Sequence, residues 1–144
     1  MIRTSVTLAL FVTLTACATS HPRKAPSASD TRLVGTWELV STKITNGPTT
    51  LVEGGPPEIR SLKILNATDY SVVTRRADQF LRAGTGRYTL VGNTYTETVD
   101  LASGATFIPG GVYTFEITLD GDMWTLDGGS GPQRVHEVWR RIRK

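Results

Sequence analysis

The sequence predicts an all-β protein, an eight-stranded antiparallel up-and-down β-barrel. From Leu33 onward the chain is rich in Thr, Val, Tyr and Trp, is interrupted repeatedly by Gly, Asn and Asp, and has no long apolar stretch at helical spacing. Short connections at residues 66–69, 92–93 and 120–122 place Gly or Asn where a positive φ is needed, which favours antiparallel pairing of successive strands. Because an eight-stranded meander loses its edges by closing on itself, a barrel is expected.

The expected strands are short and separated by turn residues. They cover residues 34–44, 59–65, 70–76, 86–91, 94–100, 112–119, 123–127 and 133–142. Residues 46–58 and 77–84 interrupt this rhythm and are expected to form loops at the barrel ends, with a helical turn at residues 78–82. Residues 101–111 carry two Gly-containing turns and are expected to span an end as well.

Composition limits the chemistry that the chain can perform. Its 144 residues suffice for one domain and a tether, and a formal net charge of +3 is too small to indicate nucleic-acid binding. Cys17 is the only cysteine, and His21 and His136 are the only histidines. We therefore expect no internal disulfide, no metal site of the His/Cys type, no cofactor and no nucleic-acid partner.

The N-terminus has the pattern of an export signal. A basic residue, Arg3, precedes the apolar run of residues 6–14, which is too short to span a bilayer. The run ends in Leu14-Thr15-Ala16-Cys17, which resembles the lipobox of bacterial lipoproteins. The resemblance implies that residues 1–16 are a signal peptide and that Cys17 becomes the lipid-bearing first residue. The alternative is an ordinary secretory signal in which the cysteine occurs by chance.

Residues 17–32 are expected to form a flexible, lipidated tether, because they contain Ser and Pro and few apolar side chains. Ala18 stands where lipoproteins retained in the inner membrane carry aspartate, so the resemblance implies a cell-envelope protein in the outer membrane, facing the periplasm, if the host has two membranes. Residues 33–144 form the predicted barrel domain, and the membrane is the partner of the N-terminal lipid.

The first and last predicted strands of the domain resemble the lipocalin, or calycin, sequence pattern. Gly35-Thr36-Trp37 forms a G-x-W near the start, and Trp139-Arg140-Arg141 lies near the end. Together with G-N-T-Y-T-E-T-V in the middle, these segments are similar to lipocalin-like bacterial domains of unknown function. The resemblance implies that Trp37 packs across one barrel end under a late arginine, either Arg140 or Arg141, an arrangement that cation–π packing would favour. The missing disulfide and the short chain depart from the better-known lipocalins.

Strand alternation selects the candidate interior residues. Tyr95, Glu97 and Val99 share one face of their strand, and Glu137 shares a face with Trp139. Two inward carboxylates could serve as acid and base, bind a polar ligand group or a cation, or pair with an arginine or a tyrosine hydroxyl inside the barrel.

The candidate ligand-binding residues are Tyr88, Tyr95, Glu97, Trp124 and Glu137, although aromatic side chains at strand spacing also simply fill cores. The sequence contains no Ser/His/Asp set, phosphate loop or redox motif, so no catalytic residue is assigned. The expected function is a non-enzymatic, lipid-anchored barrel that binds a small apolar or amphipathic ligand. The alternatives are a protein-interaction module, either an envelope assembly factor or an inhibitor of a secreted enzyme, and a small hydrolase or isomerase using Glu97 or Glu137.

Overall fold

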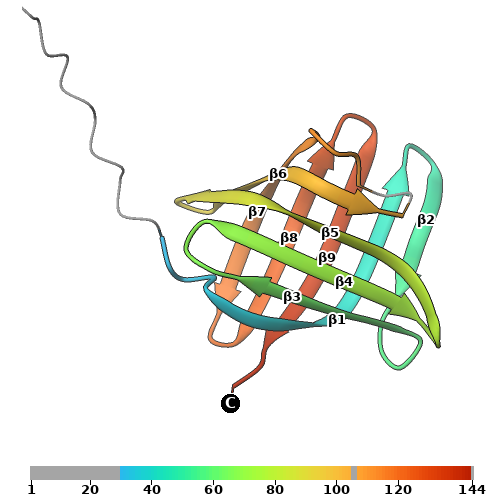
Figure 1. Cartoon of the computed structure of the whole chain (residues 1–144), viewed down its shortest axis with the longest axis horizontal. Helices are drawn as coiled ribbons and strands as arrows, with labels where there is room; N and C mark the ends of the chain where they lie inside the picture. The colour runs from blue at the N-terminus through green and yellow to red at the C-terminus, as the bar shows by residue number, and fades with distance from the viewer. Residues whose placement is uncertain (1–29, 105–106, 144) are drawn as a thin grey trace, which may run out of the picture.

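The computed structural model describes residues 30–104 and 107–143, and every regular element within these ranges is a β-strand (Figure 1). The strands are β1 Gly35–Asn46, β2 Thr49–Gly54, β3 Ile59–Leu65, β4 Asp69–Arg76, β5 Gln79–Val91, β6 Thr94–Ser103, β7 Val112–Asp120, β8 Met123–Ser130 and β9 Gln133–Arg141. The predicted signal peptide, residues 1–16, lies outside the described residues, as do Cys17 and most of the predicted tether.

Eight of these strands close into an antiparallel barrel, which confirms the predicted fold class. The barrel runs from β1 through β3 and then in chain order to β9, which returns to pair with β1 along most of its length. All pairings are antiparallel, and the turns at residues 92–93 and 121–122 connect neighbouring strands as expected. The resulting up-and-down order removes the edges that an open sheet would expose.

The prediction of a loop over residues 46–58 is wrong for its first half, which forms β2. This strand pairs with the second half of β1, from Thr42↔Gly54 to Asn46↔Thr49. Thr49, Thr50 and Val52 favour an extended backbone, and a two-residue turn after Asn46 continues the hairpin. β2 is thus a ninth strand, attached to the barrel through β1 alone.

The predicted loop over residues 77–84, with its helical turn, is also wrong. β5 already begins at Gln79, and a two-residue turn at Ala77 and Asp78 joins it to Arg76 of β4. Ala77 adopts a φ of 48°, in the left-handed region that alanine rarely occupies, and its N–H donates to the carbonyl of Glu58 at 2.7 Å. The turn lacks the Gly or Asn that would have marked it in the sequence.

Trp37 is fully buried at one end of the barrel, and Arg141 covers it. The Trp37 indole donates to the Leu33 carbonyl at 2.9 Å, and the Arg141 guanidinium carbon lies 4.1 Å from a Trp37 ring centroid. Gly35 has a φ of 142°, which other residues rarely adopt, and a Cβ there would stand 2.7 Å from the Arg141 Nη1 atom and displace the guanidinium. Arg140, the other candidate, points outward and pairs with Glu38 at 2.6 Å.

The barrel interior continues from this end as a row of three indole side chains. Trp37 meets Trp124 edge-on with 5.3 Å between ring centroids, and Trp124 stacks on Trp139 at 6.2 Å. Trp139 is thus the third indole from the closed end, and all three residues are fully buried. The three indoles pack in the interior together with Tyr70, Tyr95 and Phe115, which are also buried.

Replacing Trp37 tests how much the packing at this closed end contributes to the stability of the fold. Trp37→Ala should lower the free energy of unfolding by about 3–5 kcal/mol, because it leaves a cavity and removes the surface on which Arg141 packs. Urea unfolding measures the change. Leu101→Ala, at a position 69% exposed, is the control and should change stability by about 0.5 kcal/mol or less. A loss below about 1 kcal/mol for Trp37→Ala would contradict its role in the core.

Candidate functional site

Glu97 of β6 points into the barrel, as strand alternation predicts, and its partner is Lys63 of β3. The two side chains form a buried ion pair, in which Lys63 is 3% exposed and Glu97 is 1% exposed. The Tyr95 hydroxyl donates to the same carboxylate oxygen at 2.7 Å. Of the partners expected for this carboxylate, the tyrosine is present, and the cation is a lysine rather than an arginine.

Four aromatic rings surround the Lys63 ammonium. Its Nζ atom lies 5.2 Å from the Trp124 ring centroid, 5.3 Å from Tyr70, 5.4 Å from Tyr95 and 5.7 Å from Trp139. Each ring presents electron density to the cation, which compensates part of its lost hydration. The barrel thus contains an aromatic cage of the kind that binds ammonium groups, and its own lysine occupies that cage.

Burial keeps the phenols of this cluster protonated. Burial, and then the neighbouring charge of Glu97, raises the pKa of Tyr95 well above its usual range, and the pKa of Tyr70 is raised for the same reasons. Tyr95 therefore remains a hydrogen-bond donor to Glu97. Among the described residues, the Tyr70 hydroxyl and the Trp124 indole N–H have no hydrogen-bond partner.

Glu137 of β9 is held by a second network at the other end of the interior. Its Oε1 atom accepts from Arg82 Nη2 at 2.8 Å and from Thr42 Oγ1 at 3.1 Å, and its Oε2 atom accepts from the Trp139 indole at 3.1 Å. Arg82, on β5, also lies over Phe107, with its guanidinium carbon 4.9 Å from the ring centroid. All acceptor oxygens of Glu137 thus have protein donors.

The remaining predicted ligand residues also contact protein groups. Tyr88 donates its hydroxyl to the Asn66 carbonyl at 2.7 Å, and its ring lies 5.4 Å from that of Tyr95. Trp124 meets Tyr95 edge-on at 5.4 Å. The structure therefore joins Tyr88, Tyr95, Glu97 and Trp124 in one cluster, with Glu137 connected to it through Trp139. Their role in ligand binding stays a prediction.

Sequence reasoning missed both cations of the interior. In β3 the apolar Leu62 and Ile64 lie on the strand face opposite to Lys63, and that face is exposed. Ile59 and Leu65 lie on the same face as Lys63, and this face points into the barrel. The inward phase of Ile59 and Leu65 was the available signal. Arg82 was missed because its segment was assigned to a loop.

A groove on the outer surface lies where β1 and β3 separate. β1 pairs with β3 only from Gly35 to Glu38, and with β2 only from Thr42 onward, so residues 39–41 have no partner on that side. A bulge between Leu39 and Ser41 in the pairing with β9 accompanies this change of partner. Gly55, which follows β2, passes so close to the backbone of β1 that a Cβ at this position would stand 2.4 Å from the Val40 carbonyl oxygen.

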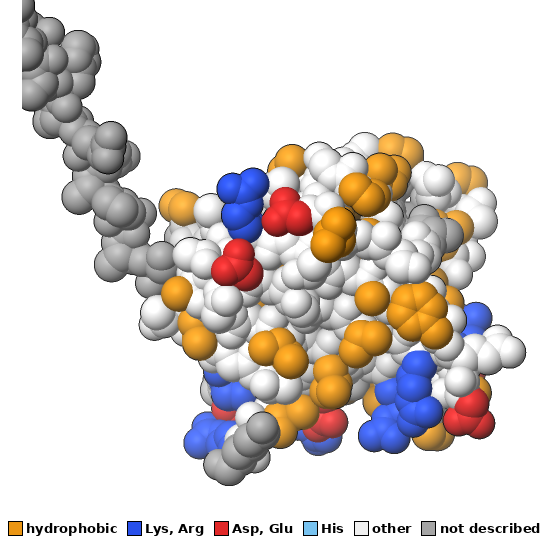
Figure 2. Space-filling view, in the orientation of Figure 1, with side chains coloured by type: hydrophobic (Ala, Val, Ile, Leu, Met, Phe, Trp, Pro, Cys, Tyr) orange, Lys and Arg blue, Asp and Glu red, His pale blue; other side chains and the backbone are white. Residues whose placement is uncertain are grey.

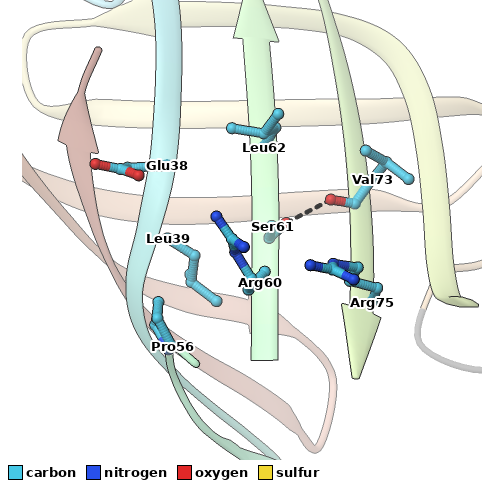
Figure 3. A pocket seen from close by; sticks show the side chains of 8 residues that line it. All are labelled: Glu38, Leu39, Pro56, Arg60, Ser61, Leu62, Val73 and Arg75. Carbon is cyan, nitrogen blue, oxygen red and sulfur yellow. Dashed lines mark hydrogen bonds between the residues drawn. The ribbon is translucent and has the colours of Figure 1, made fainter. Parts of the chain in front are cut away.

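The groove has a volume of about 330 Å³ and combines apolar and charged side chains (Figure 3). It is lined by Glu38, Leu39, Pro56, Arg60, Ser61, Leu62, Val73 and Arg75. A second hollow of about 390 Å³ shares Glu38, Leu39, Pro56 and Arg60 and extends to Arg140. Figure 2 shows apolar side chains across the neighbouring face of β3 and β4, with basic side chains beside them. The volume of the first hollow lies within the range of small-molecule sites, and its lining combines apolar and charged side chains.

Within residues 30–104 and 107–143, no three His, Cys, Asp or Glu side chains are grouped so that they could hold a metal ion. In the same ranges, no helix has the length and hydropathy needed to cross a membrane. Comparison of the chain with protein-family models and with curated proteins finds no match. The geometry of the interior and of the groove is therefore the basis for the functional argument.

Breaking the internal ion pair should be more costly than removing both of its charges. Glu97→Gln should lower the free energy of unfolding by about 3–5 kcal/mol, because it leaves the Lys63 ammonium buried without a counter-charge. Adding Lys63→Met to that variant should recover at least about 1 kcal/mol, since the thioether fits among the aromatic rings. Urea unfolding of the two single variants and the double variant gives the coupling energy.

The exposed pair Lys43–Glu53, 3.0 Å apart, is a matched control for the same residue types. Lys43→Met and Glu53→Gln should each cost about 1 kcal/mol or less, because solvent screens this pair. Equal costs at the buried and exposed pairs would show that Lys63 and Glu97 do not stabilise each other's charge in the interior.

Proposed function

We propose that the protein is a non-enzymatic, lipid-anchored binding protein of the bacterial cell envelope. In this proposal its lipocalin-like barrel is a filled scaffold, and its small apolar or amphipathic ligand binds in the outer groove between β1 and β3. The observation that carries the proposal is the groove itself, where apolar and charged side chains meet at a break in the strand pairing.

The filled interior supports an external site. A ligand in the centre of the barrel would have to displace the Lys63 ammonium from its four aromatic rings or the Trp139 indole from Glu137. Either step would leave a buried charge or a buried polar group without its partner, which costs several kcal/mol. The groove requires no such displacement, because Leu62 and Val73 already stand 44% and 50% exposed beside it.

The same contacts support a non-enzymatic role. A general acid or base must reach its substrate within hydrogen-bond distance. Glu97 and Glu137 are both buried, and each is bonded to a cation and to neutral donors of the protein. A hydrolase or isomerase using these carboxylates would first have to open the barrel.

The N-terminal pattern supports the proposed lipid anchor and location. The lipobox-like Leu14-Thr15-Ala16-Cys17 supports lipidation of Cys17, and Ala18 supports delivery to the outer membrane, facing the periplasm, in a host with two membranes. In this arrangement the tether would hold the groove near a membrane surface, where amphipathic molecules are concentrated.

A protein-interaction module is the second candidate, and the edge of β2 favours it. Among the described strands, β2 pairs only with β1, so its other edge leaves backbone N–H and C=O groups for an added strand. Leu51 is 44% exposed on this strand and could contact a partner. Under this alternative, substitutions in β2 would abolish function while substitutions in the groove would not.

Binding of the neutral, apolar dye Nile red tests the groove. The full chain should bind it, and Leu62→Ser combined with Val73→Ser should weaken binding about tenfold or more, since each methylene lost from the contact is worth up to about 0.8 kcal/mol. Val91→Ser combined with Val112→Ser removes two other exposed apolar side chains and should leave the affinity unchanged. Fluorescence titration provides the dissociation constants. Equal loss in both variants would contradict a groove site.

Replacing Cys17 tests the anchor. Cys17→Ser should abolish incorporation of labelled palmitate and release the protein from the membrane fraction, because the chain has no second cysteine to carry the lipid. Ala18→Ser preserves the cysteine and serves as the control, with labelling retained. Palmitate incorporation into the Cys17→Ser protein would rule out the assignment.

A further inference from the structure

Two arginines stand directly opposite each other in the groove. Arg60 of β3 and Arg75 of β4 are paired in the antiparallel ladder, both are exposed, and both line the groove. Figure 3 shows their guanidinium groups on neighbouring strands, on either side of Ser61. Like charges directly opposite each other in a sheet are destabilising, because the side chains are held a few ångströms apart.

Little in the described part of the chain neutralises this pair. The only ion pair of Arg75 there is with Asp78 at 3.5 Å, and that aspartate is fully exposed. For Arg60 no ion pair or hydrogen bond is found among the described residues. The other charges at the groove are already paired, since Glu38 accepts from Arg140 Nε and Nη2 at 2.9 and 2.6 Å. Arg60 and Arg75 are therefore the groove cations best able to bind an anion.

An apolar strip begins two residues further along the same pair of strands. Leu62 and Val73 are directly opposite each other, on the same outer face as Arg60 and Arg75. Ile64, two residues further along β3, continues the strip at 55% exposure. Residues two apart in a strand are about 7 Å apart, so the cationic pair and the strip lie end to end within the length of a short alkyl chain.

We propose that the groove binds a single-chain anionic amphiphile. Its oxyanion head, a carboxylate or a phosphate, lies between the Arg60 and Arg75 guanidinium groups and accepts hydrogen bonds from both. The negative charge of the head offsets the repulsion between the two guanidinium groups. Its alkyl chain covers Leu62 and Val73 toward Ile64 and withdraws them from water. This inference rests on the proposed function and specifies the ligand class of the same groove.

The test compares three probes with the same ten-carbon chain: decanoate, decanol and decyltrimethylammonium. The full chain carrying Cys17→Ser is titrated calorimetrically below the micellar range, so that no detergent is needed. Decanoate should bind about tenfold or more tightly than either other probe, because only its head group pairs with the arginines. Decanoate should also raise the urea midpoint of the protein, since it binds the folded state.

Variants separate the paired arginines from general positive charge. Arg60→Gln combined with Arg75→Gln should weaken decanoate binding about tenfold or more and leave decanol binding unchanged. Its urea midpoint should not fall, because the substitutions remove a repulsion between exposed side chains. Arg87→Gln combined with Arg134→Gln removes the same charge at exposed positions outside the groove and should leave decanoate binding within about twofold.

The outcomes distinguish this inference from the proposed function. If decanol binds as tightly as decanoate and the Arg60→Gln, Arg75→Gln variant binds both normally, the anionic specificity is wrong and the groove remains a binding site. If no probe binds, both proposals fail. If the protein binds anionic phospholipid vesicles but not decanoate, the arginines contact a membrane surface, and the single-chain ligand is wrong.

Discussion

The ammonium of Lys63 imposes the main constraint on this barrel. A charged group at 3% exposure must have a counter-charge and a polarizable environment, and here it has Glu97 and four aromatic rings. These contacts come from β3, β4, β6, β8 and β9, so the charge can be accommodated only when most of the barrel has formed. The central part of the interior is therefore arranged around this charge and the residues that surround it.

That constraint affects where a ligand can bind. An eight-stranded barrel has an interior just wide enough for its own side chains or for one small ligand, and in this protein the side chains occupy it. Three tryptophans, two ion pairs and their tyrosine and threonine donors extend from Trp37 at one end to Arg82 at the other. With the centre filled, the outer surface is the place where apolar and charged groups remain open to a partner.

The groove has its origin in the geometry of a single strand. β1 pairs with β3 over its first residues and with β2 over its last, and the ladder is interrupted between the two pairings. Gly55 allows the chain to pass close to the Val40 carbonyl before β3 begins. The interruption leaves a hollow whose floor includes the buried Leu39 and Ser61, beside the outward-facing residues of β3 and β4. The same irregularity that attaches a ninth strand thus also forms the candidate site.

The sequence by itself determined the fold class, most of the strands and the inward face of β6. Local rules suffice for these features, because turn residues mark strand ends and alternation assigns each side chain to a face. They failed at Ala77, where a turn has no Gly or Asn, and at β2, where the Gly and Pro residues that follow it obscured a short strand.

Only the tertiary structure decided the partners. Glu97 meets Lys63 across three strand pairings, and Glu137 meets Arg82 from a strand that is not its neighbour in the barrel. Alternation shows that a side chain points inward, but the residue that it meets depends on how the sheet curls and closes. The choice of Arg141 over Arg140 above Trp37 follows from the inward face of β9, which the sequence left ambiguous. The groove, which depends on where β1 changes partners, could likewise be found only in the closed barrel.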